Sequence, residues 1–153
     1  MFTAGMVWLI TFIVCFYFSV PAYGMNYTDC SPENIHVLDV SVSNCEGEAW
    51  CPLYRGNFTD LSIVFQVDSE VNNLTALVHG GVGGVFLKFN HKAKNALHWG
   101  SGLICPLVPG KIYNYTTSIN VKKMYPPIKS VVRWQLMEGQ NKIVCVLIPG
   151  EII

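Results

Sequence analysis

The side chains that could do chemistry in this sequence are four histidines, a glycine cluster and a close pair of glutamates. The histidines, at positions 36, 79, 91 and 98, include no pair at the i, i+2 or i, i+4 spacing typical of metal ligands. The glycine cluster at 79–84 (HGGVGG) lacks the Lys-Ser/Thr ending of a phosphate-binding loop. It therefore favours a bend or a close backbone approach within a sheet. Glu46 and Glu48 lie in a cysteine-bounded loop and have the pattern of a solvated pair.

The sequence contains neither a G-x-S-x-G turn for a nucleophilic serine nor an H-E-x-x-H zinc motif. We therefore expect a binding protein and not an enzyme, with no catalytic residues, no metal site and no cofactor. The formal charge is zero, and no clustered arginines accompany it, so nucleic acid is not an expected partner.

The first 24 residues have the features of a secretory signal peptide. The apolar run 6–20 is followed by Pro21, and the small residues Ala22 and Gly24 occupy the −3 and −1 positions of a cleavage site. An uncleaved anchor or a buried helix are the alternatives. We expect cleavage after Gly24, which leaves one domain over residues 25–153.

Cysteines and sequons agree with a secreted protein. Five cysteines remain after cleavage, an odd number, so disulfides with one thiol left over are expected. Asn26 begins a sequon too close to the new terminus to count. The expected glycosylation sites are Asn57, Asn73 and Asn114.

The elements that must position any site are strands. Residues 61–67 alternate apolar and polar side chains most clearly, and similar runs follow up to residue 148. An earlier strand is expected around residues 36–42, where His36, Leu38, Val40 and Val42 should share one face. About seven strands at these spacings predict an all-β sandwich. Its inward side chains either close into a core or, if the sheets splay at one end, line a cavity.

The order and spacing of several blocks resemble the ML lipid-recognition family, and within it the sterol carriers. The likeness covers essentially all of residues 25–153. The blocks that carry it are the small cysteine loop 43–53, 76–80 (ALVHG), 104–107 (ICPL), 121–126 (VKKMYP) and 128–136 (IKSVVRWQL).

The resemblance implies an immunoglobulin-like sandwich of two sheets around an apolar pocket that carries one sterol. It also implies transfer between membranes or to a membrane sterol transporter, in the extracellular space or the lysosomal lumen. A carrier of fatty acids or hydrophobic semiochemicals, and a receptor-associated module that presents lipids, are the alternatives. The resemblance places Phe89, Val121 and Tyr125 at the mouth of the pocket and matches Trp134 to a strand tryptophan of the family. With Phe65 and Val132, these are the expected lipid-binding residues. An ordinary core aromatic is the alternative for Trp134, and a surface tyrosine at a strand end is the alternative for Tyr125.

The family pattern also implies the disulfides Cys30–Cys145 and Cys45–Cys51. Cys105 matches the end of a further loop whose partner position is occupied by Trp99, so we expect it to be unpaired. A buried thiol and an intermolecular disulfide are its two possible fates.

This chain departs from the family in the basic segment before Cys105. Lys88, His91, Lys92 and Lys94 surround the expected mouth residue Phe89, and we hypothesise that they dock on anionic membranes. Protonation of the histidines below about pH 6.5 would strengthen this docking. Lys122 and Lys123 are expected to face away from the pocket.

Overall fold

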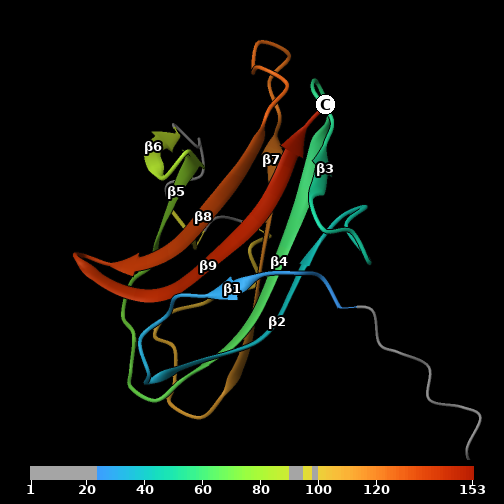
Figure 1. The fold of residues 1–153 in the computed structure, drawn as a ribbon. Coiled ribbons are helices and arrows are strands. Elements are labelled where there is room, and N and C mark those ends of the chain that lie inside the picture. Colours follow the sequence, from blue (N-terminus) through green and yellow to red (C-terminus); the bar gives the residue numbers. More distant parts are fainter. Residues whose placement is uncertain (1–23, 90–94, 98–99) are drawn as a thin grey trace, which may run out of the picture.

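A computed structural model describes residues 24–89, 95–97 and 100–153, and these fold as a two-sheet sandwich (Figure 1). The all-β prediction is confirmed, although the strand number rises from about seven to nine. The two additional strands, β1 and β3, are too short to show alternation in sequence. The strands are β1 (Thr28–Asp29), β2 (Ile35–Val42), β3 (Cys51–Leu53), β4 (Phe58–Val67), β5 (Thr75–Val82), β6 (Val85–Phe89), β7 (Ile112–Asn120), β8 (Lys129–Glu138) and β9 (Asn141–Ile152).

The larger sheet has the order β1-β9-β8-β5-β6, with β3 added in parallel along β9. The smaller sheet has the order β2-β4-β7 and is antiparallel. The long strands β8 and β9 curve around one side of the molecule and β2, β4 and β7 form the other (Figure 1). The described residues include no helix long and apolar enough to cross a membrane.

The predicted face of β2 is wrong in its first half. The pairing register of β2 with β4 shifts between Val37 and Asp39, so Leu38 is the extra residue of a β-bulge. Ile35 therefore points inward, whereas His36 and Leu38 are exposed. Beyond the bulge Val40 and Val42 face the core, as predicted.

One end of the sandwich is a packed core. Phe65 of β4 is fully buried, and its ring centroid lies 6.2 Å from that of Tyr113 on β7. Leu136 and Val144 of the larger sheet, both fully buried, close this end from the other side.

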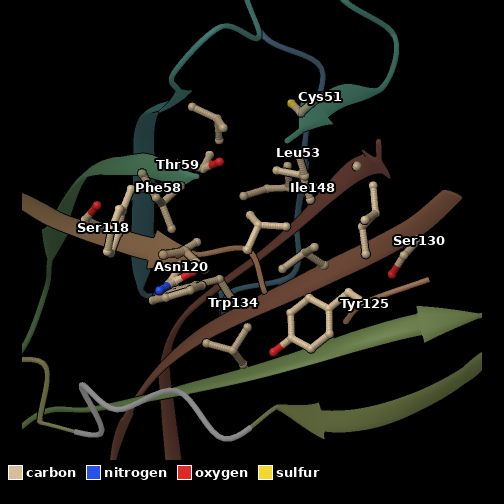
Figure 2. A pocket seen from close by; sticks show the side chains of 18 of the residues that line it. Cys51, Leu53, Phe58, Thr59, Ser118, Asn120, Tyr125, Ser130, Trp134 and Ile148 are labelled. Atoms are coloured by element: carbon tan, nitrogen blue, oxygen red, sulfur yellow. The ribbon is translucent and has the colours of Figure 1, made fainter. Parts of the chain in front are cut away.

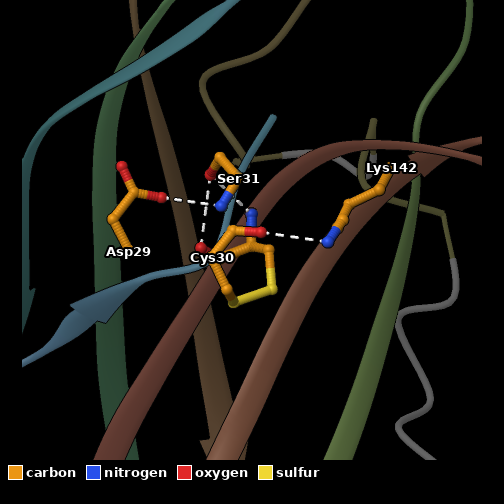
Figure 3. The surroundings of a disulfide bond; sticks show 5 residues. Asp29, Cys30, Ser31 and Lys142 are labelled. Carbon is orange, nitrogen blue, oxygen red and sulfur yellow. Dashed lines mark hydrogen bonds between the residues drawn. A yellow bond between two sulfur atoms is a disulfide. The ribbon is translucent and has the colours of Figure 1, made fainter. Parts of the chain in front are cut away.

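Both predicted disulfides are present. Cys30–Cys145 ties β1 to β9 across 115 residues, and Cys45–Cys51 closes the small loop before β3. Figure 3 shows hydrogen bonds around the first: the Lys142 ammonium donates to the Cys30 carbonyl at 3.0 Å, and the Ser31 amide donates to the Asp29 carboxylate at 2.8 Å. The Cys30 amide also donates to the Cys145 carbonyl at 2.8 Å.

Cys105 forms no disulfide with the other cysteines in the described part of the chain, as expected. It is half-buried against the core cluster, and burial raises its pKa. Because the thiolate is the reactive form, the structure supports the buried-thiol alternative. Trp99, the residue at the expected partner position, lies outside the described residues.

The free edge of β7 is covered by the loop at 100–103. Thr116 donates its amide to the Ser101 carbonyl at 2.8 Å and its hydroxyl to the Gly100 carbonyl at 2.8 Å. Gly102 permits this approach, because its φ is +77° and a Cβ there would lie 2.5 Å from the Asn114 carbonyl oxygen. The loop thereby blocks further strand pairing at this edge.

Candidate functional site

A cavity of about 630 Å³ lies between the sheets at the end opposite the packed core. It forms where β4 and β8 begin and where β7 and β9 end, and Figure 2 shows their side chains converging on it. The end of β2, the short strand β3 and the 121–125 connection complete its wall. The volume is within the range of ~300–1,000 Å³ typical of small-molecule sites.

The cavity has room because several of the inward positions at this end carry small side chains. Thr59 of β4, Ser130 and Val132 of β8 and Gly150 of β9 face the space, whereas the packed end has aromatic and leucine side chains at equivalent inward positions. Alternation along a strand fixes which residues point inward, and their volumes decide whether the space is filled.

The lining is apolar in the interior and mixed around the mouth. Ile148, Leu61 and Val78 contribute aliphatic surface. Polar groups that also line the cavity come from the end of β7, the connection after it and the start of β4 and β8: Ser118, Asn120, Lys122, Tyr125, Thr59 and Ser130.

Trp134 is fully buried and also lines the cavity, so it serves both the core and the site. Tyr115 of β7 packs against it with ring centroids 6.3 Å apart. Burial raises the pKa of Tyr115 to about 12, and hydrogen bonds to Thr117 and Trp134 oppose that shift. This aromatic pair lies between the cavity and the packed end.

The structure brings four of the six predicted lipid residues together: Val121, Tyr125, Val132 and Trp134 all line the cavity. Phe65 does not line it. It lies four residues beyond the lining residue Leu61, about 14 Å along the strand. Phe89 pairs with Val78 in the sheet register, but its side chain lies outside the described part of the structure.

Of the two lysines expected to face away from the pocket, one is placed differently. Lys122 lines the cavity instead of facing away, because the chain leaves β7 before it and no longer alternates as a strand. Lys123 packs against the Gly56 turn. Lys88 pairs with His79 on the outer face of the larger sheet, and His91, Lys92 and Lys94 lie outside the described residues.

Several lining residues were not identified from sequence, among them Phe58, Thr59, Ser130 and Ile148. Phe58 is 68% exposed although it is a large apolar residue, so it forms part of the mouth. Extending the alternation of β4 back from Leu61 would have identified Thr59 as inward-facing.

The three expected glycosylation sites are exposed. Asn57 lies beside the cavity mouth, because its carbonyl accepts a hydrogen bond of 3.0 Å from the Val121 amide. The Asn114 amide oxygen accepts from Ser62 at 2.6 Å, and the Asn73 amide oxygen accepts from the Leu74 amide at 2.9 Å.

Across the described residues, no group of three or more histidine, cysteine or acidic side chains is arranged to hold a metal ion. What the site offers is an enclosed apolar space with hydroxyl, amide and ammonium groups at its rim. Such a space removes the body of a hydrophobic molecule from water and leaves one polar end near the surface.

Known proteins share both sequence and fold with this chain. NPC intracellular cholesterol transporter 2 of Danio rerio is 32% identical over 130 residues, which cover 84% of this chain and 85% of that protein. The ecdysteroid-regulated 16 kDa protein of Manduca sexta is 34% identical over 134 residues, covering 87% and 92%.

A solved structure agrees with these relatives. The crystal structure of a Niemann-Pick type C2 protein from Japanese carpenter ant superposes with a TM-score of 0.78 at 26% identity, covering 84% of this chain and all of that one. A family model described as the ML domain matches residues 24–152. The chain therefore belongs to the ML domain family.

Proposed function

We propose that this protein is a carrier that holds one sterol in the cavity and transfers it between membranes or to a membrane sterol transporter. The observation that carries the proposal is the cavity of about 630 Å³, apolar inside and polar at the rim. A sterol has a rigid apolar body and a single hydroxyl, which match this distribution. The relatives named as cholesterol transporters support the same choice of ligand.

Burial of the sterol body supplies the affinity. At about 25 cal/mol per Å² of apolar surface removed from water, a few hundred Å² contribute roughly 5–8 kcal/mol before ordering costs. Few polar contacts are needed, so the Tyr125 hydroxyl and the Lys122 ammonium at the rim, with the buried hydroxyls of Thr59 and Ser130, are sufficient partners for a ligand hydroxyl.

The proposal includes secretion. Residues 1–24, of which 1–23 lie outside the described structure, serve as a cleaved signal peptide, and the carrier acts in the extracellular space or the lysosomal lumen. Two disulfides and three exposed sequons support an oxidising, glycosylating route.

Docking on anionic membranes is part of the same proposal. The segment from Lys88 to Lys94 supplies the cations, each contributing about 1 kcal/mol near a charged surface. Transfer between vesicles should accelerate with anionic lipid and slow with salt. Transfer that is insensitive to both would exclude this role for the segment.

Native mass spectrometry of the secreted protein tests the choice of ligand, because it identifies the molecule that copurifies in the cavity. We expect a sterol at one per chain. A copurified fatty acid or hydrophobic semiochemical would replace the sterol in the proposal, and a stable complex with a receptor ectodomain would indicate a lipid-presenting module.

Filling the cavity tests its location. Val132→Trp places an indole in the space, so we expect the affinity for a fluorescent sterol to fall by about tenfold or more. Val64→Trp, at a half-buried position that faces away from the cavity on β4, is the matched control and should bind normally. Equal affinities of the two variants would place the sterol elsewhere.

A further inference from the structure

Three basic side chains lie in a row across the outer face of the larger sheet. Arg133 of β8 pairs directly with His79 of β5, which in turn pairs with Lys88 of β6. Directly opposed residues project from the same face of a sheet, with Cβ atoms about 5 Å apart. Their neighbours Val132 and Val78 line the cavity, so this cationic row lies on the opposite face of the sheet.

The Arg133 guanidinium is held in place by an aromatic ring. Its central carbon lies 4.3 Å from the centroid of Phe86. Gly81 makes this stacking possible, because a Cβ at that position would come within 2.6 Å of the Phe86 ring. A glycine in β5 and a phenylalanine in β6 thus orient a cation on β8.

Two polar atoms of the row are buried without a partner. Arg133 Nε and His79 Nδ1 have no hydrogen-bond partner among the described residues. The described residues form two ion pairs, His36–Asp68 and Lys129–Glu151, and neither involves the row. Arg133 and Lys88 therefore have no acidic partner among the described residues, and a buried polar atom without a hydrogen bond costs stability.

We propose that Arg133, His79 and Lys88 form a binding site for a phosphate-type oxyanion. A tetrahedral oxyanion would accept hydrogen bonds from the oriented guanidinium and the imidazole while the Lys88 ammonium, which is exposed, adds charge. Such an ion would offset the positive charges of Arg133 and Lys88, which have no acidic partner among the described residues. The site is independent of the sterol cavity.

Sulfate is the first probe, because its charge is constant across neutral and mildly acidic pH. Proton–nitrogen spectra are recorded as sodium sulfate replaces sodium chloride at constant ionic strength. We expect saturable shifts of the Arg133 Nε–H signal and of the amides of residues 79, 88 and 133. Inorganic phosphate should produce the same pattern. Shifts no larger than those given by chloride would overturn the proposal.

Variants separate the site from general charge effects. Arg133→Gln should weaken sulfate binding by about tenfold or more. Arg55→Gln removes the other arginine of the chain, an exposed one, and should change nothing. Phe86→Leu keeps every charge but removes the stacked ring, and should weaken binding about threefold. If Arg133→Gln fails to fold, Phe86→Leu and Lys88→Gln still decide, and normal sulfate affinity in both would overturn the site.

The pH dependence gives a further readout. Desolvation, with the charges of Arg133 on β8 and Lys88 on β6, lowers the pKa of His79 below its ordinary value. Sulfate affinity should therefore rise as the pH falls through that lowered pKa, and His79→Gln should abolish the rise. A pH-independent affinity in the wild type would contradict the role of His79.

Two sources could supply the oxyanion, a soluble phosphate or a phospholipid headgroup. Flotation with phosphatidylcholine vesicles, with and without phosphatidylglycerol, distinguishes them. Recruitment that requires phosphatidylglycerol and is lost in Arg133→Gln but not Arg55→Gln identifies a headgroup. Saturable phosphate binding without Arg133-dependent recruitment identifies a soluble ligand. Sterol binding is measured alongside and should be normal in every variant, so the two proposals can fail separately.

Discussion

At the scale of single residues, side-chain volume at inward positions decides where this sandwich is hollow. Thr59 and Gly150 leave space that Phe65 and Leu136 fill further along the same sheets. Trp134 stands between the two regions, buried by the core on one side and facing the cavity on the other. Because tight packing on one side holds its ring in place, the tryptophan gives the cavity a rigid wall.

Tyr115, packed behind Trp134, carries a prediction for stability at alkaline pH. Burial raises the pKa of Tyr115 from 10.0 to about 12 in the folded state. As the pH rises from about 10 to about 12, the unfolded chain releases this proton while the folded chain retains it. Folding stability should therefore fall across this window, by roughly 2 kcal/mol from this group.

Tyr115→Phe should remove that part of the pH dependence, although it lowers stability at neutral pH by loss of the hydroxyl contacts. Urea unfolding at a series of alkaline pH values measures the slope. Tyr54→Phe is the control, because it removes an exposed tyrosine and keeps Tyr115, so its stability should depend on pH as that of the wild type does. Parallel stability curves for wild type and Tyr115→Phe would contradict the prediction.

At the scale of elements, irregular segments set the positions that alternation alone cannot. The bulge at Leu38 reverses which residues of β2 face inward, and only the pairing with β4 reveals it. Lys122 shows the same effect after β7, where the chain turns and places a lysine at the cavity. Alternation with a period of two predicts which side chains of a regular strand point inward, but it predicts nothing for residues beyond the ends of the strand.

The loop that covers the β7 edge carries the element-scale prediction. Gly102→Ala should destabilise the fold by about 2–3 kcal/mol, because it adds a clash with the Asn114 carbonyl to the strain of a positive φ. Gly100→Ala, with φ of +88° and no atom within 4 Å of its added Cβ, has the strain alone. Urea midpoints should place Gly102→Ala clearly below Gly100→Ala, and equal losses would show that the close approach is unimportant.

At the scale of the whole molecule, the sandwich has one packed end and one open end. Seven of the nine strands were predictable from alternation, and the family resemblance implied both the cavity and the two disulfides. The boundary along the strand axis was not predictable, because Leu61 and Phe65 share one face and one pattern. Only the spatial arrangement shows that Leu61 lines the cavity and Phe65 lies in the core.

The two disulfides divide between these ends, and their removal should separate stability from binding. Cys30–Cys145 spans 115 residues and lies outside the cavity lining, whereas Cys45–Cys51 spans 6 residues and Cys51 lines the cavity. From the loop-closure entropy, removing the long bridge should lower the free energy of unfolding by about 4–5 kcal/mol, and removing the short one by about 2 kcal/mol.

Urea unfolding and sterol titration of the two double-alanine variants measure both effects. We expect Cys30→Ala/Cys145→Ala to lose more stability yet keep sterol affinity while folded, and Cys45→Ala/Cys51→Ala to lose affinity. The reverse pattern would mean that the cavity wall is set by the β1–β9 junction instead of by the small loop before β3.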